Sequence, residues 1–213
     1  MPDTRISGEP AAGSFLLADE LPVNEAGTTK KVTGTQLQAR VAVAGSSGAT
    51  GAQTPAASTR TYITGSAIVI PAEKIRIGTF FSWQFDMTKT AAGIAASTFD
   101  ICFGTLGTTA DTARVSFTKP AGTAAADVGI VTIGAVVRGP LSAAGIVSGN
   151  FQLTHVGGAT GLLGHCAEPA ICVNALSAGF DVTVAALIVG VCITSGAADA
   201  ITIQQVIAQA GNL

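Results

Sequence analysis

Hydrophobic and polar residues alternate with a period of two along most of the chain after Tyr62, which is the pattern of half-buried β-strands. Phe81, Trp83 and Phe85 alternate with polar residues, so we predict that these three side chains belong to the core. Residues 128–138 have hydrophobic residues at both even-numbered and odd-numbered positions, which predicts a strand covered on both faces. The remaining predicted strands are 68–70, 75–77, 99–103, 115–117, 146–155, 171–173, 182–193 and 201–207.

These ten segments, some of them very short, correspond to about eight or nine strands, and loops rich in Gly, Ala, Thr and Pro separate them. The pattern predicts an all-β fold, an antiparallel two-sheet sandwich whose strand count suits a jelly roll. An immunoglobulin-like topology is the competing interpretation, but the Cys–Trp–Cys framework is absent. Two similar segments, TKTAAGIAAS (88–97) and TKPAGTAAAD (118–127), are interpreted as the tips of adjacent hairpins.

The N-terminal residues 1–44 follow a different pattern. A hydrophobic segment around Leu21 and Val23 predicts a strand, residues 24–27 a turn, and residues 28–33 a returning strand. Thr35-x-x-Gln38 matches a capping box, which predicts a short helix at about residues 36–43. A hairpin and one short helix cannot bury a core of their own. We therefore expect this module to need a partner surface.

Residues 45–60, GSSGATGAQTPAASTR, predict a flexible linker rich in Gly, Ser and Ala. Gly45, Gly48 and Gly51 fall at every third position, the spacing of a collagen-like triple strand. So few triplets cannot form a triple helix, yet the spacing favours a trimer. The predicted organisation is an attachment module at 1–44, a linker at 45–60 and a β-sandwich domain at 61–213.

Charged residues make up 11% of the chain, against roughly 25% in typical soluble domains, and the net charge is −2. A surface so poor in charge is typical of proteins that contact neighbouring protein; the alternative is a stable β domain with a threonine-rich surface. The clustered cations of a nucleic-acid binder are absent, and so is an apolar run of roughly 20 residues. We expect no nucleic acid and no membrane insertion.

The sequence offers little catalytic chemistry, so we predict no enzyme and no cofactor. The chain has two histidines and no GxSxG, Walker or HExxH motif. Carboxylate pairs for glycoside cleavage stay open, because such partners meet only in the fold. His155, His165, Cys166 and Cys172 could ligate zinc, but their spacing lacks the C-x2-C hook, and we predict no metal site. Cys102 and Cys192 are interpreted as inert buried thiols.

The stretch LLADELPVNEAGTTKKVTGTQLQ (16–38) resembles the N-terminal attachment segment of many tailed-bacteriophage appendage proteins. The body resembles phage structural β-domains through YITGSAIVIP, residues 88–118 and FQLTH. The resemblance implies a homotrimeric virion protein whose N-terminal module docks on the particle while the sandwich projects outward. The residues that it implies for particle docking are Leu21, Val23, Thr28, Thr29, Lys30, Lys31, Val32 and Leu37.

Three functions stay open at this point. The first is a short fibre or spike on the tail or head of a phage particle, with contact to the host surface as an open question. The second is a capsid decoration, or cement, protein that stabilises the head shell. The third is a carbohydrate-binding or carbohydrate-active jelly roll. The implied partners are copies of the chain, other virion proteins (tail, portal-proximal or capsid) and a host surface glycan; the implied location is the virion, assembled in the host cytoplasm.

Overall fold

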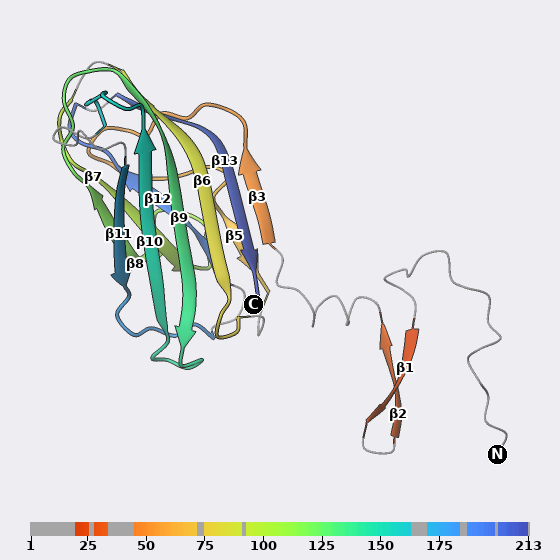
Figure 1. Cartoon of the computed structure of the whole chain (residues 1–213). Coiled ribbons are helices and arrows are strands. Elements are labelled where there is room, and N and C mark those ends of the chain that lie inside the picture. Colours follow the sequence, from red (N-terminus) through yellow and green to blue (C-terminus); the bar gives the residue numbers. More distant parts are fainter. Residues whose placement is uncertain are drawn as a thin grey trace, which may run out of the picture. The chain divides into compact units, whose positions relative to one another are not determined.

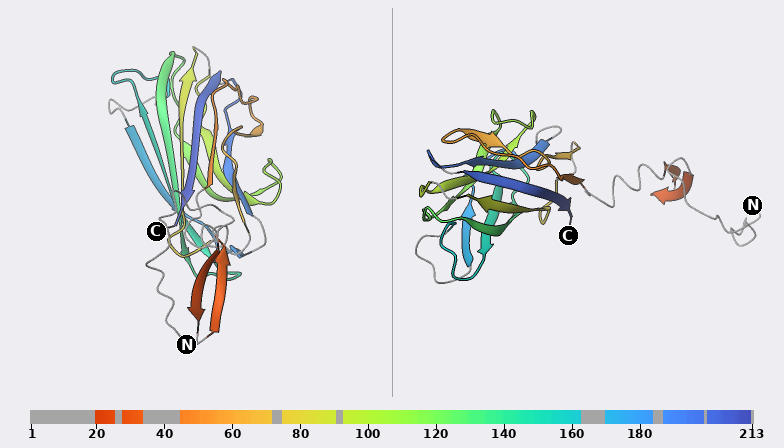
Figure 2. Two further views of the ribbon diagram at one scale, coloured as in Figure 1. Left: turned by 90° about the vertical axis from the view of Figure 1, so that its right-hand side faces the viewer. Right: turned by 90° about the horizontal axis from the view of Figure 1, so that it is seen from above.

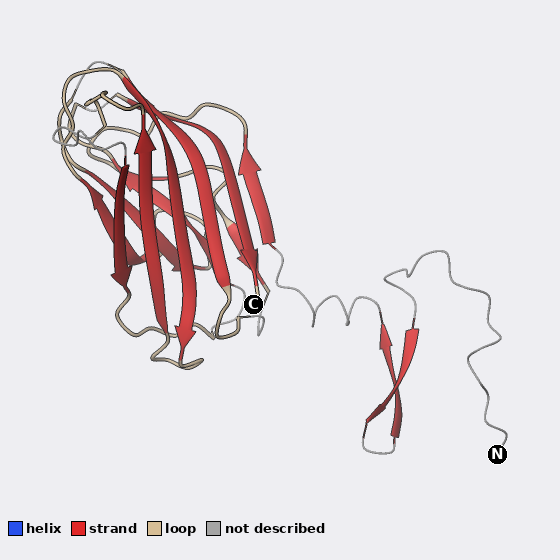
Figure 3. Ribbon diagram, viewed as in Figure 1, coloured by secondary structure: helices blue, strands red, loops and turns tan. Residues whose placement is uncertain are grey.

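The structure is a computed structural model that describes residues 20–25, 28–33, 45–71, 75–90, 93–162, 170–183, 187–198 and 200–212. The chain divides into two compact units, Met1–Ala42 and Val43–Leu213. Every regular element in the described residues is a β-strand (Figure 3). No helix in this part of the chain is long and apolar enough to cross a membrane.

The first unit contains an antiparallel hairpin of β1 (Glu20–Glu25) and β2 (Thr28–Thr33). Leu21 lies opposite Val32, and Val23 lies opposite Lys30. The hairpin predicted from the sequence is therefore confirmed. Strand β1 continues through residues 24 and 25, which the sequence pattern assigns to the turn, so the connection is shorter than predicted. The predicted helix at 36–43 lies outside the described residues.

The second unit is a sandwich of two antiparallel sheets, as predicted, and the two layers are visible in Figures 1 and 2. The large sheet has the order β11 (Ala170–Leu176), β10 (Ile146–His155), β9 (Asp127–Gly139), β6 (Phe80–Lys89), β13 (Ile201–Gly211) and β3 (Gly45–Ala49). The small sheet has the order β4 (Arg60–Tyr62), β12 (Leu187–Thr194), β7 (Ser97–Gly104) and β8 (Thr112–Lys119), and β5 (Ile68–Ile70) also pairs with β12.

The strand order is that of a jelly roll. One sheet contains the run β3-β13-β6-β9 and the other contains β12-β7-β8 with β5 beside β12, so early and late strands are neighbours. The hairpin β10–β11 extends the large sheet beyond β9. The similar loops after Lys89 and Lys119 connect β6 to β7 and β8 to β9, from one sheet to the other. Their interpretation as hairpin tips is wrong.

Aromatic rings fill the space between the sheets. Phe81, Trp83 and Phe85 occupy alternate positions of β6 and are at most 1% exposed. The ring of Phe99, on the small sheet, lies 6.0 Å from Phe85 and 5.0 Å from Phe151, centroid to centroid. Because rings from the two sheets interlock in this way, the facing sides of both sheets are closed to solvent.

Strand β9 differs from its prediction in one respect. Its side chains are buried alternately, so only one face of the strand is covered. Val128 is 52% exposed and Ile130 is 44% exposed on the outer side of the large sheet. The prediction that both faces of residues 128–138 are covered is therefore wrong for a single chain. Residues 75–77 form no strand, which corrects a second prediction.

The predicted linker is also corrected, because its first residues form the edge strand β3. Strand β3 pairs with β13, and Gln53 makes two backbone hydrogen bonds to Ile203 further on. A Cβ on Gly45 would overlap the side chain of Ile68, and one on Gly48 would lie 2.9 Å from a backbone oxygen. The glycine spacing thus reflects close packing at the sheet edge rather than a linker or a collagen-like strand.

This packing predicts that substituting two glycines of the same triplet pattern changes the free energy of unfolding by different amounts. Gly45→Val should lower the free energy of unfolding by about 1–3 kcal/mol, because its side chain would be forced against Ile68. Gly51→Val is the matched control, since a Cβ there meets open space. Urea denaturation followed by circular dichroism measures both. Equal, near-zero effects would mean that residues 45–49 are a linker after all.

Candidate interaction surfaces

The outer side of the large sheet is a broad face, which we call the outer face. Its positions alternate with the core positions on each strand, and most of its side chains are small, polar and uncharged. The described positions of this face include Ser46, Gly48, Phe80, Ser82, Gln84, Asp86, Thr88, Val128, Ile130, Thr132, Gly134, Val136, Ser148, Asn150, Gln152, Thr154, Asn174, Leu176, Thr202, Gln204, Ile207 and Gln209.

The strand register arranges these residues in rows across the sheet. One row runs from Asn174 through Asn150, Gly134, Ser82 and Gln209 to Ser46. A Cβ on Gly134 would overlap the Asn150 side chain, so the asparagine lies over the glycine. Side chains such as Asn, Gln and Ser both donate and accept hydrogen bonds. The outer face can therefore pair with a surface of the same composition.

Charge is distributed unevenly over the sandwich. Asp86 is the only charged residue in the middle of the outer face among the described positions, and Arg138 lies on the same side near the end of β9. The other described charged residues of the second unit lie on the small sheet and its loop, or at the two ends of the sandwich. They are Arg60, Asp100, Asp111 and Arg114 on the small sheet and its loop, and Arg76, Lys89, Lys119, Asp127, Arg138 and Asp181 at the ends.

The hairpin β1–β2 carries most of the residues predicted to dock on a particle. Leu21 and Val23 lie on β1. Thr28, Thr29, Lys30, Lys31 and Val32 lie on β2, so the register brings the two groups side by side. Leu37 lies outside the described residues. The docking role itself stays a prediction.

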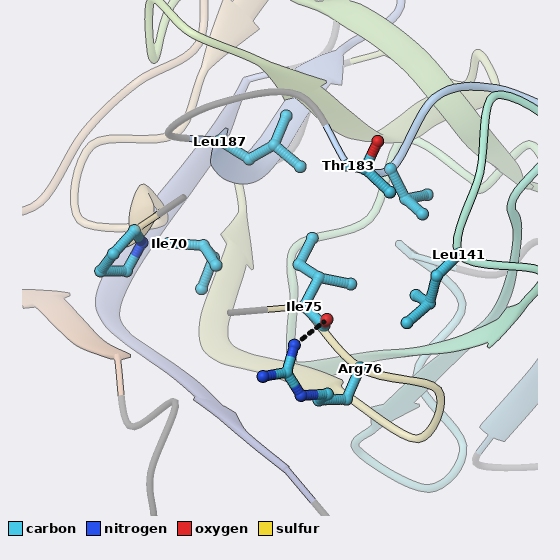
Figure 4. A pocket seen from close by; sticks show the side chains of 8 residues that line it. Ile70, Ile75, Arg76, Leu141, Thr183 and Leu187 are labelled. Carbon is cyan, nitrogen blue, oxygen red and sulfur yellow. Dashed lines mark hydrogen bonds between the residues drawn. The ribbon is translucent and has the colours of Figure 1, made fainter. Parts of the chain in front are cut away.

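A small pocket opens at the end of the sandwich where β6 begins (Figure 4). Its walls are mostly aliphatic and include Ile70, Ile75, Leu141 and Leu187, and its volume is about 210 Å³. The guanidinium of Arg76 donates to the backbone oxygen of Ile75 at 3.1 Å. Sites for small molecules usually occupy roughly 300–1,000 Å³ and hold several converging polar groups. This pocket is smaller and offers few such groups.

A buried polar cluster closes the opposite end. Asp127 Oδ2 lies 2.9 Å from Nδ1 of His155 and accepts the backbone N–H of Leu162 at 2.9 Å. Lys89 and Lys119 donate to backbone oxygens of the adjoining loops, including those of residues 123 and 162. The side chains of His155 and Asp127 have no exposed surface. The cluster therefore fastens loops to the sandwich.

The structure describes only two of the four residues considered as zinc ligands, His155 and Cys172. His155 pairs with Asp127, and its Nε2 has no hydrogen-bond partner among the described residues. Residues 163–169, which contain His165 and Cys166, lie outside the described part of the chain, and Cys172 lies on β11 opposite Gln152. Where residues are described, no three His, Cys, Asp or Glu side chains converge as metal ligands would.

A second polar cluster, on the outer side of the small sheet, was not predicted. Arg60 of β4 contacts Asp100, and it also contacts Cys102, whose sulfur lies 3.0 Å from that of Cys192. These residues are far apart in sequence, and no local pattern connects them. Only the pairing of β7 with β12 brings the two thiols together.

The buried end cluster predicts a large stability cost for losing one carboxylate. Asp127→Ala should reduce the free energy of unfolding by about 3 kcal/mol, because His155 and the Leu162 N–H would be left buried without their partner. Asp181→Ala, which removes an exposed carboxylate, should have a much smaller effect on stability. Chemical denaturation at pH 7 compares them. A cost at Asp127 no larger than that at Asp181 would contradict the fastening role.

Comparisons with known proteins give only weak similarities. No protein-family model matches the chain, and no curated protein matches it. The CBM2 module of the evolved Dit of Lactobacillus casei BL23 phage J-1 is 10% identical, with a TM-score of 0.32 over 75% of this chain and 76% of that one. A protein of unknown function from Shewanella oneidensis MR-1 is 10% identical, with a TM-score of 0.38 over 81% and 88%. Similarity at this level identifies neither a family nor a ligand.

Proposed function

We propose that this chain is a structural protein of a tailed-bacteriophage particle, a short trimeric fibre or spike. The N-terminal unit docks on the particle, and the jelly-roll sandwich projects outward. The observation that carries the proposal is the division of the chain into a complete sandwich and a separate unit with a two-stranded hairpin. An isolated two-stranded hairpin is at best marginally stable in water. Such a unit is expected to gain its stability from a larger assembly.

The docking role also rests on sequence. The residues that resemble phage attachment segments, from Thr28 to Thr33, form the whole of β2. Leu21 and Val23 are paired with them across the hairpin. The proposed attachment segment is therefore one continuous structural element. Its proposed partners are other virion proteins, at the tail, near the portal or on the capsid.

The outer face supports self-association. Val128 and Ile130 come from a stretch whose two-sided hydrophobic pattern suits a strand covered on both faces, yet a single chain leaves them exposed. Strand spacing of about 4.8 Å and a rise of about 3.4 Å per residue give the six-stranded face an area on the order of 700 Å². A standard interface buries about 800 Å² per partner. A face that is nearly free of charge can meet its own copies without electrostatic repulsion.

A structural role agrees with the composition of the surface better than a glycan-directed one. Proteins that bind or cleave glycans stack sugar rings on exposed aromatic side chains, whose polar tips also suit a wet interface. Trp83 is fully buried in the core, and the Tyr62 hydroxyl is buried against Gly190 of the small sheet. The described part of the outer face contains no tryptophan or tyrosine. We therefore propose a binding and structural role without enzymatic activity.

Removing residues 1–42 tests the docking role. The shortened protein should keep its β-rich circular dichroism spectrum, because both sheets of the sandwich lie in Val43–Leu213. It should no longer join particles when it is the only copy supplied during infection. Incorporation is measured by immunoblotting of purified particles. A folded but truncated protein that still assembles into particles would refute the attachment role.

Cryo-electron microscopy of particles carrying the full-length protein then separates the two structural functions. Density on a tail or a vertex supports a fibre or spike. Density repeated over the shell lattice would replace this proposal with a decoration protein. Particles without any density for the protein would overturn both.

The trimer is tested by placing charge in the middle of the outer face. By light scattering, the wild-type protein should have the mass of about three chains. Gln84→Lys combined with Gln152→Lys should shift it toward a single chain, because like charges would meet where the copies pack. Thr118→Lys is the control, since it adds charge at an exposed position of β8 on the small sheet. A monomeric wild type, or a double variant that remains trimeric, would contradict this use of the face.

A further inference from the structure

Cys102 and Cys192 form a pair of thiols at the centre of the small sheet. They lie on the neighbouring strands β7 and β12, and both side chains are completely buried. Cys102 is registered with Gly190, and Cys192 is registered with Asp100, so the two cysteines are diagonal neighbours. Their sulfur atoms are 3.0 Å apart. Both are free cysteines in this structure.

The thiols lie on the outer side of the sheet, because their sequence neighbours, such as Ile101 and Val191, belong to the core between the sheets. They are nevertheless shielded from solvent by a cover. Gly190 leaves the space opposite Cys102 free of a side chain, and the Tyr62 hydroxyl occupies it: a Cβ on Gly190 would overlap that hydroxyl.

Arg60 holds this cover in place. Its Nε donates to Asp100 at 3.0 Å, and its Nη2 lies 3.0 Å from the sulfur of Cys102. Its Nη1 donates to the backbone oxygens of Thr109 and Asp111, at 2.7 Å and 3.1 Å. Asp111 in turn accepts backbone N–H groups from residues 106–108. One guanidinium thus links the loop between β7 and β8 to the sulfur of Cys102.

The surroundings also prepare one sulfur to react. A thiolate, rather than a thiol, attacks an oxidant. The hydrogen bond from Cys102 and the positive charge of Arg60 both lower the pKa of Cys192, against the opposing effect of burial. The hydrogen bond to Cys192 and burial raise the pKa of Cys102. The positive charge of Arg60, whose guanidinium contacts the sulfur of Cys102, therefore favours a thiolate within this pair.

We propose that Cys102 and Cys192 are a modification site, a thiol pair that closes into an intrachain disulfide when the protein meets a peroxide. The thiolate of one cysteine attacks one oxygen of hydrogen peroxide, which breaks the O–O bond, forms a sulfenic acid and releases hydroxide. The sulfur of the other cysteine then displaces the sulfenic oxygen and loses its proton, which forms the S–S bond and releases water. In total, two thiols are oxidised and one peroxide is reduced to two waters.

Disulfide chemistry suits this pair better than metal binding. Two thiolates alone leave a zinc ion short of its usual four ligands. No further His or Cys joins the two sulfurs among the described residues. The nearby Arg60 carries a positive charge, which favours a thiolate but repels a cation.

The consequence of the bond follows from its position. The two cysteines are 90 residues apart in the sequence, and β8 to β11 lie between them. A crosslink across so long a segment restricts the unfolded chain strongly, so it stabilises the folded state. It also joins β7 directly to β12 in the middle of the small sheet. The folded structure needs to bring the two sulfurs only about 1 Å closer to reach bonding distance.

The test uses the full chain with Cys166→Ser and Cys172→Ser, so that the pair provides the only thiols. The protein is treated with hydrogen peroxide, denatured, exposed to N-ethylmaleimide and weighed by mass spectrometry. The reduced protein should take up two maleimides. The oxidised protein should take up none, weigh about 2 Da less and remain a single chain on a non-reducing gel. Its melting midpoint should rise by about 10 °C, and dithiothreitol should reverse the rise.

Adding Cys192→Ser to this background gives the matched control, which should take up one maleimide before oxidation and show no rise in its melting midpoint. If the double serine background does not fold, peptide mapping of the oxidised wild-type protein gives the same answer through the peptide that links residues 102 and 192. Two maleimides after peroxide, sulfinic or sulfonic acids in place of the disulfide, or linkage only between chains would each overturn the proposal.

Discussion

The interlocking of aromatic rings between the two sheets is the interaction on which the rest of the structure depends. Phe151 of the large sheet contacts both Phe99 and Phe117 of the small sheet, with centroids 5.0 Å and 5.8 Å apart. Phe81 meets Phe103 edge to face in a second contact of this kind. These rings fill the space between the inner sides of the two sheets. Any partner of the sandwich therefore has to bind to the outer sides, the ends or the loops.

The outer sides of the two sheets differ in how far their side chains are exposed to solvent. On the small sheet, Arg60 and Tyr62 cover Asp100, Cys102 and Cys192, and Arg60 hydrogen-bonds to both Asp100 and Cys102. On the large sheet, hydrophobic side chains such as Ile130 stay partly exposed between uncharged polar ones. The closed side suits internal chemistry between fixed groups, whereas the open side suits a protein partner. This asymmetry is why the thiol pair and the self-association face are assigned to different sheets.

The sequence predicts the fold well where burial follows a simple period. The alternation in β6 and β10 is strong, and β10 has the predicted bounds, residues 146–155. Strands β3 and β4 escape prediction because they are short and have little hydrophobic pattern; pairing with β13 and β12 forms them. The Cys102–Cys192 pair could not be predicted either, since strand register decides which distant residues meet. For the candidate surfaces, the sequence indicates the hairpin but not the composition of the outer face.

One difference between the predicted and the observed burial is relevant to function, and it is in β9. A strand that is hydrophobic at both parities is expected where both faces are covered, and here only the inner face is. Local propensity for β-structure cannot account for the outward residues, because Thr132 and Gly134 in the same strand show that small or polar residues are accepted there. We therefore propose that a second protein surface covers the outward Val128 and Ile130. A copy of the same face, uncharged and able to pair its own amides and hydroxyls, meets that requirement with no further partner.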